Sequence, residues 1–401
     1  MNVIVVQIGA RHHYAVPRML ERAGVLAAFH TDAIGVMGLG RWLPRVPGIG
    51  GDAALRKLGQ RVPHGVPLAR IRQTDALLWR RIRGKLRLGP MPVGYIEDDH
   101  IFDEITAGWG FGGADTLYAM QKHGTRLLES ARAAGVRVVV DVFITPLAHR
   151  IVEDERRRFP DIEPPSDNED TLEREDDRNR REFACADLLL CPGENVVEGV
   201  RAYAEGRDKA VAVVPYGCGV DFEGRRNTPV KGRILFAGTA DLRKGIHYLG
   251  MAASKLARRG LDFRVAGNVP ESIRRHPLMK DLNFLGRLPA PAMREEFLAA
   301  DTFVLPTLAE GCASVVHEAV MADCPVVTTA ASGTLVRNGR GGRIVPERDA
   351  DALAEVIVEV VEKRSMRDEL AESCRGLAEE LSEDAWSRRL MAAVGGMNFE
   401  C

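Results

Sequence analysis

The sequence predicts an α/β protein of two domains, each built on a parallel β-sheet with helices on its faces. Its 401 residues are many for one hydrophobic core and sufficient for two. Short apolar runs, typical of buried strands, alternate with helical patterns along most of the chain. The chain also opens with a strand, a glycine and a helix, which together form the first unit of a Rossmann-like domain.

The first domain is expected to span residues 1–220. Its opening strand, residues 2–8, is followed by Gly9 and by a helix that continues through Leu20. A second helical pattern covers residues 127–134. The other expected strands are 136–143, 186–191 and 210–215. Residues 153–182 are dominated by charges of both signs, which predicts a solvated, partly mobile helix–loop–helix excursion.

The second domain, residues 221–383, repeats this alternation. The hinge between the domains is expected at residues 216–232, which are rich in glycine and polar side chains. The expected strands are 233–237, 261–267, 282–285, 302–305, 325–328 and 342–345, with helices over 245–259 and 349–363. A last helix, residues 383–391, carries Trp386.

The stretch that contains Glu310 and Glu318 is the most informative part of the second domain. A buried strand ends at Leu305, a loop with Gly311 follows, and a helix begins near Ala313. The start of a helix offers unpaired N–H groups and a partial positive charge, which suit a phosphate. Carboxylates accept hydrogen bonds, so the two glutamates suit the hydroxyl groups of sugars. The stretch therefore predicts a site for a nucleotide sugar.

This stretch resembles the signature of the retaining glycosyltransferases with two Rossmann-like domains, the GT-B fold. The family is glycosyltransferase family 4, group 1, with a Glu-x7-Glu signature. The matching residues are Glu310, Gly311, Ser314, Val315, Glu318, Ala319, Pro325, Val326 and Val327. The resemblance implies that Glu310 contacts the donor sugar and that Glu318 binds the ribose hydroxyls. The backbone implied to surround the donor belongs to Gly311, Ala313, Ser314 and Val315. The resemblance also implies a terminal helix that crosses back, so that residues 384–401 complete the first domain.

The loop at residues 238–245 resembles the diphosphate loop of the same family. Gly238 opens the loop, and Lys244 matches the family's lysine, which makes Lys244 a candidate catalytic residue beside Glu310. The family's arginine is replaced by Thr239, whose hydroxyl can bind a phosphate oxygen but carries no charge. Arg243 is the candidate substitute for that arginine.

Four further candidates come from the resemblance. Arg287 follows a segment that is similar to the one bordering the nucleobase, and Gly333 lies in a turn similar to the one facing the donor. In the first domain, Gly9 fits the family's glycine loop after the first strand. The family's histidine near the end of a later strand has its nearest candidate in His149, which is expected in a loop.

The function implied by the resemblance is transfer of a sugar from a nucleotide-diphosphate sugar, with retention at the anomeric carbon. The expected acceptor is a glycan, a glycolipid or a small molecule, in cell-surface polysaccharide or glycolipid biosynthesis. Two alternatives stay open at this point. One is a non-catalytic relative that only binds nucleotide sugars, and the other is an epimerase on the same fold.

No cofactor other than the donor substrate is expected, and no metal ion. The nearest acidic string, Glu97 to Asp99 followed by His100, precedes a helical stretch and is interpreted as a loop with N-capping acids. Seven scattered cysteines with no CxxC pair favour a reducing cytoplasm over a disulfide framework or a zinc site. A signal peptide and an apolar run of membrane-spanning length are both absent from the sequence.

Residues 56–87 form a strongly basic segment with interleaved apolar side chains, including Trp79. An amphipathic basic segment of this kind suits an anionic membrane surface, an anionic acceptor or simply solvent. Nucleic acid is not expected, because too few aromatic side chains are available to stack on bases. The expected location is cytoplasmic, with peripheral attachment to the inner face of the membrane as one option.

Overall fold

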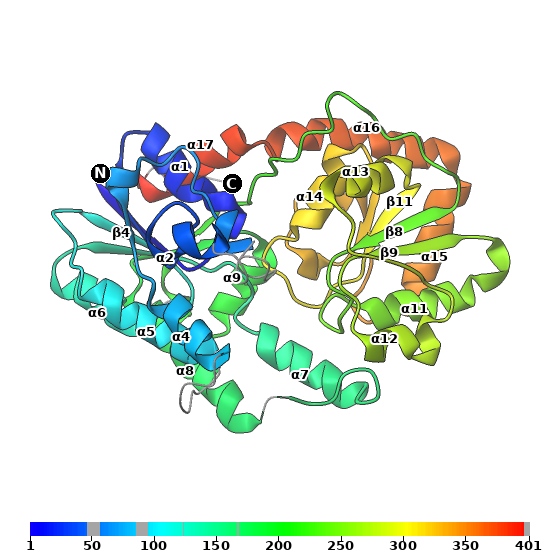
Figure 1. The fold of residues 1–401 in the computed structure, drawn as a ribbon. Helices are drawn as coiled ribbons and strands as arrows, with labels where there is room; N and C mark the ends of the chain where they lie inside the picture. Colours follow the sequence, from blue (N-terminus) through cyan, green and yellow to red (C-terminus); the bar gives the residue numbers. More distant parts are fainter. Residues whose placement is uncertain (46–56, 86–94, 123, 167, 397–401) are drawn as a thin grey trace.

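The computed structural model describes residues 1–45, 57–85, 95–122, 124–166 and 168–396. Two seven-stranded sheets lie side by side, each surrounded by helices, and all of their strand pairs are parallel (Figure 1). The predicted fold class, two Rossmann-like domains in the GT-B arrangement, is confirmed. The domain boundary near residue 220 stays a prediction.

The first sheet has the strand order β3-β2-β1-β4-β5-β6-β7. Its strands are β1 (Val3–Gln7), β2 (Leu26–Thr31), β3 (Ile71–Gln73), β4 (Thr116–Met120), β5 (Arg137–Asp141), β6 (Leu188–Cys191) and β7 (Ala210–Val213). The surrounding helices are α1 (Ala15–Arg22), α2 (Gly38–Trp42), α4 (Ala76–Lys85), α5 (Tyr95–Ala107), α6 (Thr125–Ala133), α7 (Ala148–Arg158), α8 (Glu169–Cys185), α9 (Glu194–Arg201) and α10 (Ala204–Arg207).

The second sheet has the order β10-β9-β8-β11-β12-β14-β13. Its strands are β8 (Arg233–Ala237), β9 (Asp262–Ala266), β10 (Asn283–Gly286), β11 (Thr302–Leu305), β12 (Val326–Thr328), β13 (Arg337–Asn338) and β14 (Gly341–Ile344). The helices that follow these strands are α11 (Ile246–Lys255), α12 (Glu271–Arg275), α13 (Ala290–Ala299), α14 (Ser314–Met321), α15 (Ala350–Glu362), α16 (Arg364–Glu380) and α17 (Glu383–Val394).

Both faces of the first sheet are buried. Val3 and Val5 of β1 contribute to one hydrophobic cluster, whereas Ile4 and Val6 contribute to another on the opposite face. Side chains alternate across a strand, so a strand covered on both sides is a continuous apolar run, as the sequence analysis expected. The second domain has one large cluster of its own.

The terminal helix crosses back as the resemblance implied. α16 lies along the second domain and α17 lies against α1 of the first (Figure 1). Trp386 and Leu390 of α17 are buried in a first-domain cluster. At the start of α17, Glu383 accepts hydrogen bonds from the Arg18 guanidinium at 3.0–3.1 Å. The first domain therefore takes part of its core from the end of the chain.

The charged stretch at residues 153–182 is not a solvated excursion, so this prediction is wrong. α7 lies against the second domain, and its Glu153 and Glu155 are buried. α8 packs on α6 and α10 of the first domain and buries Glu175, Asn179 and Glu182. Some charges do pair at i,i+3 as expected, such as Arg157 with Asp154. The buried Glu155, however, is bonded to residues far away in sequence, which a local reading of the sequence cannot detect.

Two smaller expectations also need correction. The acidic string at Glu97 lies in the first turns of α5 and not in a loop, and His149 lies in the first turn of α7. In the described part of the basic segment, residues 57–85, a short helical turn, β3 and α4 follow one another, and Arg61 and Arg80 are paired with Asp32 and Asp98 at 2.9 and 3.0 Å.

Candidate active site

The candidate site lies where the strand order of the second sheet reverses. From β8 the chain moves outward to β9 and β10, and then returns to the other side of β8 with β11. The loops that leave β8 and β11 lie at the carboxyl ends of these strands, beside the reversal, which is the usual ligand position in such sheets. These two loops, residues 238–245 and 306–313, carry half of the site residues predicted from the sequence.

The two loops are held together by close backbone contacts. The amide of Leu308 donates to the carbonyl of Arg243 at 2.8 Å, and the Thr307 hydroxyl donates to the same carbonyl at 3.0 Å. Gly245 has a φ of +71°, and a Cβ there would lie 1.9 Å from the carbonyl oxygen of Pro306. Only glycine fits this left-handed and crowded position. The contacts fix the direction in which Arg243 and Lys244 leave the backbone.

Both cations point to Glu310. Lys244 Nζ and Arg243 Nη1 each lie 2.7 Å from Glu310 Oε1, and the Glu310 side chain is only 13% exposed. Burial opposes ionisation of this carboxyl, but Lys244 and Arg243 outweigh it and hold the pKa of Glu310 below its ordinary value. The cluster is thus an ionised carboxylate shared by two cations at the carboxyl ends of β8 and β11.

Glu318 differs from Glu310 in having no side-chain partner within the described parts of the chain. It lies on α14, half-buried, and burial alone raises its pKa. A carboxylate of this kind has unused acceptor capacity for hydroxyl groups. At the start of α14, the amides of Ser314 and Val315 have no acceptor within the helix. The amide of Ala313, by contrast, already donates to the Ser332 carbonyl at 2.9 Å, so it is not free to bind a phosphate.

Beside this cluster, glycines and backbone carbonyls bring the two domains into close contact. A Cβ on Gly311 would lie 1.8 Å from the Phe143 carbonyl oxygen of the first domain. Gly333 lies against the carbonyl of Gly311 just as closely, at a φ of +65°. From the first domain, Asn195 Nδ2 donates to the carbonyls of Glu310 and Ala331 at 2.7 and 3.1 Å. The Glu310 backbone is therefore held from both domains.

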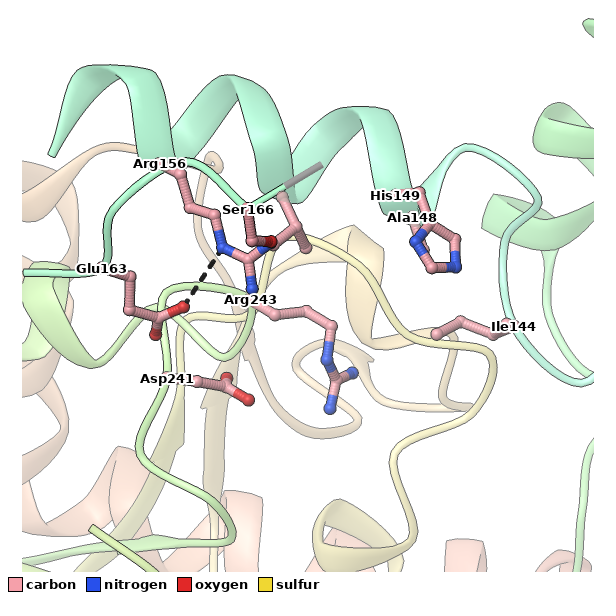
Figure 2. A pocket seen from close by; sticks show the side chains of 9 residues that line it. Ile144, Ala148, His149, Arg156, Glu163, Ser166, Asp241 and Arg243 are labelled. Atoms are coloured by element: carbon pink, nitrogen blue, oxygen red, sulfur yellow. Dashed lines mark hydrogen bonds and ion pairs between the residues drawn. The ribbon is translucent and has the colours of Figure 1, made fainter. Parts of the chain in front are cut away.

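His149 reaches the same region from the first domain. Together with Asp241 and Arg243 it lines a cavity of about 380 Å³ between α7 and the loop after β8 (Figure 2). Its Nε2 lies 2.8 Å from Lys122 Nζ and 3.8 Å from Glu175. The structure thus places His149 across the cavity from the loop after β8, in an ion network of the first domain.

The other predicted residues are more dispersed. Thr239 is exposed on the loop after β8, and the Lys244 side chain passes over Gly238. Arg287 is exposed at the end of β10, beyond β9 at the edge of the sheet, and makes no side-chain contact with the cluster. Gly9 follows the end of β1 and has a φ of +78°. Its amide donates a hydrogen bond to the Asp32 carboxylate, which follows β2. The roles of Arg287 and Gly9 stay predictions.

Asn195 and Asp241 are site residues that the sequence analysis missed. Asn195 comes four positions after β6, and Asp241 accepts a hydrogen bond from the Lys244 amide at 2.9 Å. Both follow the carboxyl end of a parallel strand, which was the available signal. No group of three His, Cys, Asp or Glu side chains in the described ranges is arranged to hold a metal ion.

Comparison with known proteins identifies the part of the chain that carries this site. Residues 231–363 match the sequence profile of the family described as Glycosyl transferases group 1. This part of the chain is a glycosyl transferases group 1 domain. The glycosyltransferase domain includes Lys244, Glu310 and Glu318, and the resemblance stated from the sequence is confirmed at the level of this family.

One relative and two solved structures show how far the likeness extends. The lipopolysaccharide core biosynthesis glycosyltransferase LpsE of Rhizobium meliloti (strain 1021) is 29% identical over 201 residues, which are 47% of this chain and 58% of LpsE. The chain thus spans little more than half of this relative. Sucrose-phosphate synthase from Thermosynechococcus elongatus superposes with a TM-score of 0.67 at 16% identity over 99% of both chains. Anabaena Alr3699/HepE, in complex with UDP and glucose, superposes with a TM-score of 0.62 at 14% sequence identity, over 99% of this chain and 100% of its own. The two structures establish the shared fold.

Proposed function

We propose that the protein is a retaining glycosyltransferase that transfers a sugar from a nucleotide-diphosphate sugar to a glycan, a lipid-linked saccharide or a small-molecule acceptor. The observation that carries the proposal is the cluster of Lys244, Arg243 and Glu310 at the strand-order reversal of a glycosyl transferases group 1 domain. The name of LpsE supports an acceptor in cell-surface polysaccharide or glycolipid biosynthesis.

On this proposal the diphosphate takes the place that Glu310 now holds beside the two cations. Lys244, Arg243 and the amides of Ser314 and Val315 stabilise the negative charge that develops as the bond between C1 and the diphosphate breaks. Glu310, released from the cations, orients the donor sugar and stabilises positive charge at C1. The acceptor oxygen bonds to C1, and its proton leaves with the diphosphate.

The proposal is tested with a panel of nucleotide sugars in the presence of excess chelator. UDP-glucose is the first donor to try, since HepE was solved with UDP and glucose. We expect slow release of nucleoside diphosphate that a suitable acceptor accelerates, and NMR of the product should show retained anomeric configuration. Activity that needs Mn²⁺ or Mg²⁺ would contradict the metal-free diphosphate site. Inverted product would contradict retention.

A non-catalytic nucleotide-sugar-binding protein is the second candidate function. Thr239 replaces a charged residue of the family pattern, and Glu310 is paired with both remaining cations of the loop and offsets one of their two charges. Such a protein would bind nucleoside diphosphate without turning over any donor. The same panel distinguishes the two functions, since binding measured by calorimetry with no product from any donor would favour the second.

Glu318→Ala is expected to weaken binding of the nucleoside diphosphate itself by about 10- to 100-fold. The proposed reason is that Glu318 accepts hydrogen bonds from both ribose hydroxyls, and charge-assisted hydrogen bonds contribute about 1.5–3 kcal/mol. Titration calorimetry with the nucleoside diphosphate measures the loss. The matched control is Glu355→Ala, a solvent-exposed change on α15 of the same domain. Unchanged affinity in folded Glu318→Ala protein would refute the assignment.

The basic segment is proposed to meet an anionic membrane surface, with the protein acting on the cytoplasmic side. Trp42 on α2 and Trp79 on α4 have exposed fractions of 63% and 53%, and none of the described helices is long and apolar enough to cross a membrane. Exposed aromatic rings and arginines suit the headgroup region of a bilayer.

Replacing Trp79 with Ser together with Arg81→Glu is expected to reduce co-sedimentation with anionic liposomes severalfold at low salt. Arg181→Glu is the matched charge control. Arg81 and Arg181 are both 63% exposed, and each has one acidic partner, at 3.5 and 3.4 Å respectively. Wild-type protein that stays in the supernatant at low salt would exclude membrane docking by this segment.

A further inference from the structure

The segment between β5 and α8 belongs to the first domain by sequence but packs on the second. We call residues 148–163, which comprise α7 and the turn after it, the α7 strap. Ile162 of the strap is buried in the hydrophobic cluster of the second domain, and Ile151 and Phe159 pack against the same cluster. The strap therefore shares its core with the glycosyltransferase domain.

Polar contacts fix the strap along its length. Glu155 is 0% exposed and accepts hydrogen bonds from Tyr248 Oη at 2.6 Å and Arg348 Nε at 2.8 Å, with His247 Nε2 at 3.1 Å. Near the end of the strap, Asp161 lies 2.9 Å from His276 Nε2. A buried carboxylate with three partners has little freedom to move, so the turn that follows α7 has a defined position on the second domain.

The last residue of the strap contacts the phosphate loop directly. Glu163 Oε1 accepts a hydrogen bond from the amide of Leu242 at 2.8 Å. Leu242 immediately precedes Arg243 and Lys244, the two cations that point to Glu310. The other carboxylate oxygen of Glu163 lies 3.5 Å from Arg156 Nε of α7 (Figure 2). Glu163 thus links the strap to the backbone of the loop that carries the site's positive charge.

We propose that Glu163 is a positioning residue for the donor diphosphate: by holding the Leu242 amide from the strap, it sets the orientation of Arg243 and Lys244. The inference rests on the proposed function, because it concerns the same diphosphate site. Loops at strand ends tolerate several backbone conformations, and an anion-binding loop that is already ordered loses less entropy when the ligand binds. Glu163, which belongs to the first domain by sequence, orders the loop through its hydrogen bond to the Leu242 amide.

The test compares Glu163→Ala with Glu163→Gln. Alanine removes the acceptor for the Leu242 amide, so we expect the dissociation constant for the nucleoside diphosphate to rise about tenfold, as for loss of one hydrogen bond. Glutamine keeps an acceptor oxygen at the same place and is expected to bind within about twofold of wild type. Arg156 remains bonded to Glu153 in both variants. Asp154→Ala is the matched control, since Asp154 is an exposed acid on α7 whose partner, Arg157, lies on the same helix.

Titration calorimetry supplies the affinities, and hydrogen exchange of the Leu242 amide supplies a readout that does not depend on activity. Faster exchange and weaker binding in Glu163→Ala, with both restored in Glu163→Gln, support the inference. Equal affinity in all variants, or equal loss in the alanine and glutamine variants, overturns it. If wild-type protein itself binds no nucleoside diphosphate, the proposed function fails, whereas the exchange of Leu242 still reports whether Glu163 orders the loop.

Discussion

Replacing Glu310 with Gln is expected to reduce sugar transfer by about 100- to 1,000-fold while nucleoside diphosphate binds at least as tightly as to wild type. The reduction follows from losing a preorganised charge beside C1, for which effects of this size are typical. The retained affinity follows from the structure, because Glu310 Oε1 now occupies Lys244 and Arg243 at 2.7 Å each. Glutamine releases both cations for the diphosphate.

Turnover and calorimetric affinity must be measured on the same preparation to separate these two effects. Glu296→Gln is the matched control. Glu296 has a side-chain exposure of 15%, similar to that of Glu310, and also pairs with an arginine, Arg264, at 2.7 Å. It lies on α13, outside the cluster. Wild-type turnover in Glu310→Gln would remove Glu310 from the mechanism, and a parallel loss of diphosphate affinity would show that the carboxylate does not compete for the cations.

Replacing Glu155 with Ala is expected to destabilise the protein by about 3–5 kcal/mol at neutral pH. The change removes a buried carboxylate and leaves the Tyr248 hydroxyl, the His247 ring and the Arg348 guanidinium without their acceptor, which is the costly way to break a buried pair. Denaturant unfolding of the variant and of wild type measures the difference. Glu155→Gln, which keeps one acceptor oxygen, should lose less, and Asp154→Ala should lose little.

The stabilisation by Glu155 is also expected to depend on pH. Burial opposes its ionisation, but hydrogen bonds from His247, Tyr248 and Arg348 lower its pKa from the ordinary 4.5 to about 2. A folded-state pKa below the unfolded one stabilises the protein above pH 4.5, and the contribution disappears as the pH falls from about 4.5 to about 2. The difference between wild type and Glu155→Ala should therefore be constant near neutrality and shrink in acid. A difference that grows in acid would contradict this electrostatic account.

Strands with a strong local pattern were predictable, and weakly patterned ones were not. β1, β5, β8 and β11 are apolar runs rich in branched side chains, and each was expected within a few residues of its observed bounds. β2 and β4 were missed. β2 contains two alanines and a histidine, and β4 is a five-residue run with a single β-branched residue, Thr116. Such runs become strands because parallel neighbours on both sides bury them.

The residues of the candidate site that lie on loops directly after strands were predictable from the sequence. Lys244, Glu310 and Glu318 stand at fixed distances from a strand end, and parallel topology brings such positions to one edge of the sheet. Contacts that a residue makes with a helix or loop distant in sequence could not be predicted in this way. The occupied amide of Ala313 and the contacts of Asn195 depend on where Ser332 and α9 lie in space.

By itself, the sequence determined the α/β class, the repeated domain plan and the two loops of the candidate site, because each depends on residues within about ten positions of one another. Only the tertiary structure decided which charges meet. Glu310 pairs with cations 66 and 67 positions earlier, and Glu155 of a seemingly solvated helix is bonded to residues 92, 93 and 193 positions later. Coulomb attraction and hydrogen bonding act through space, and a buried charge needs its partner wherever the fold has placed it.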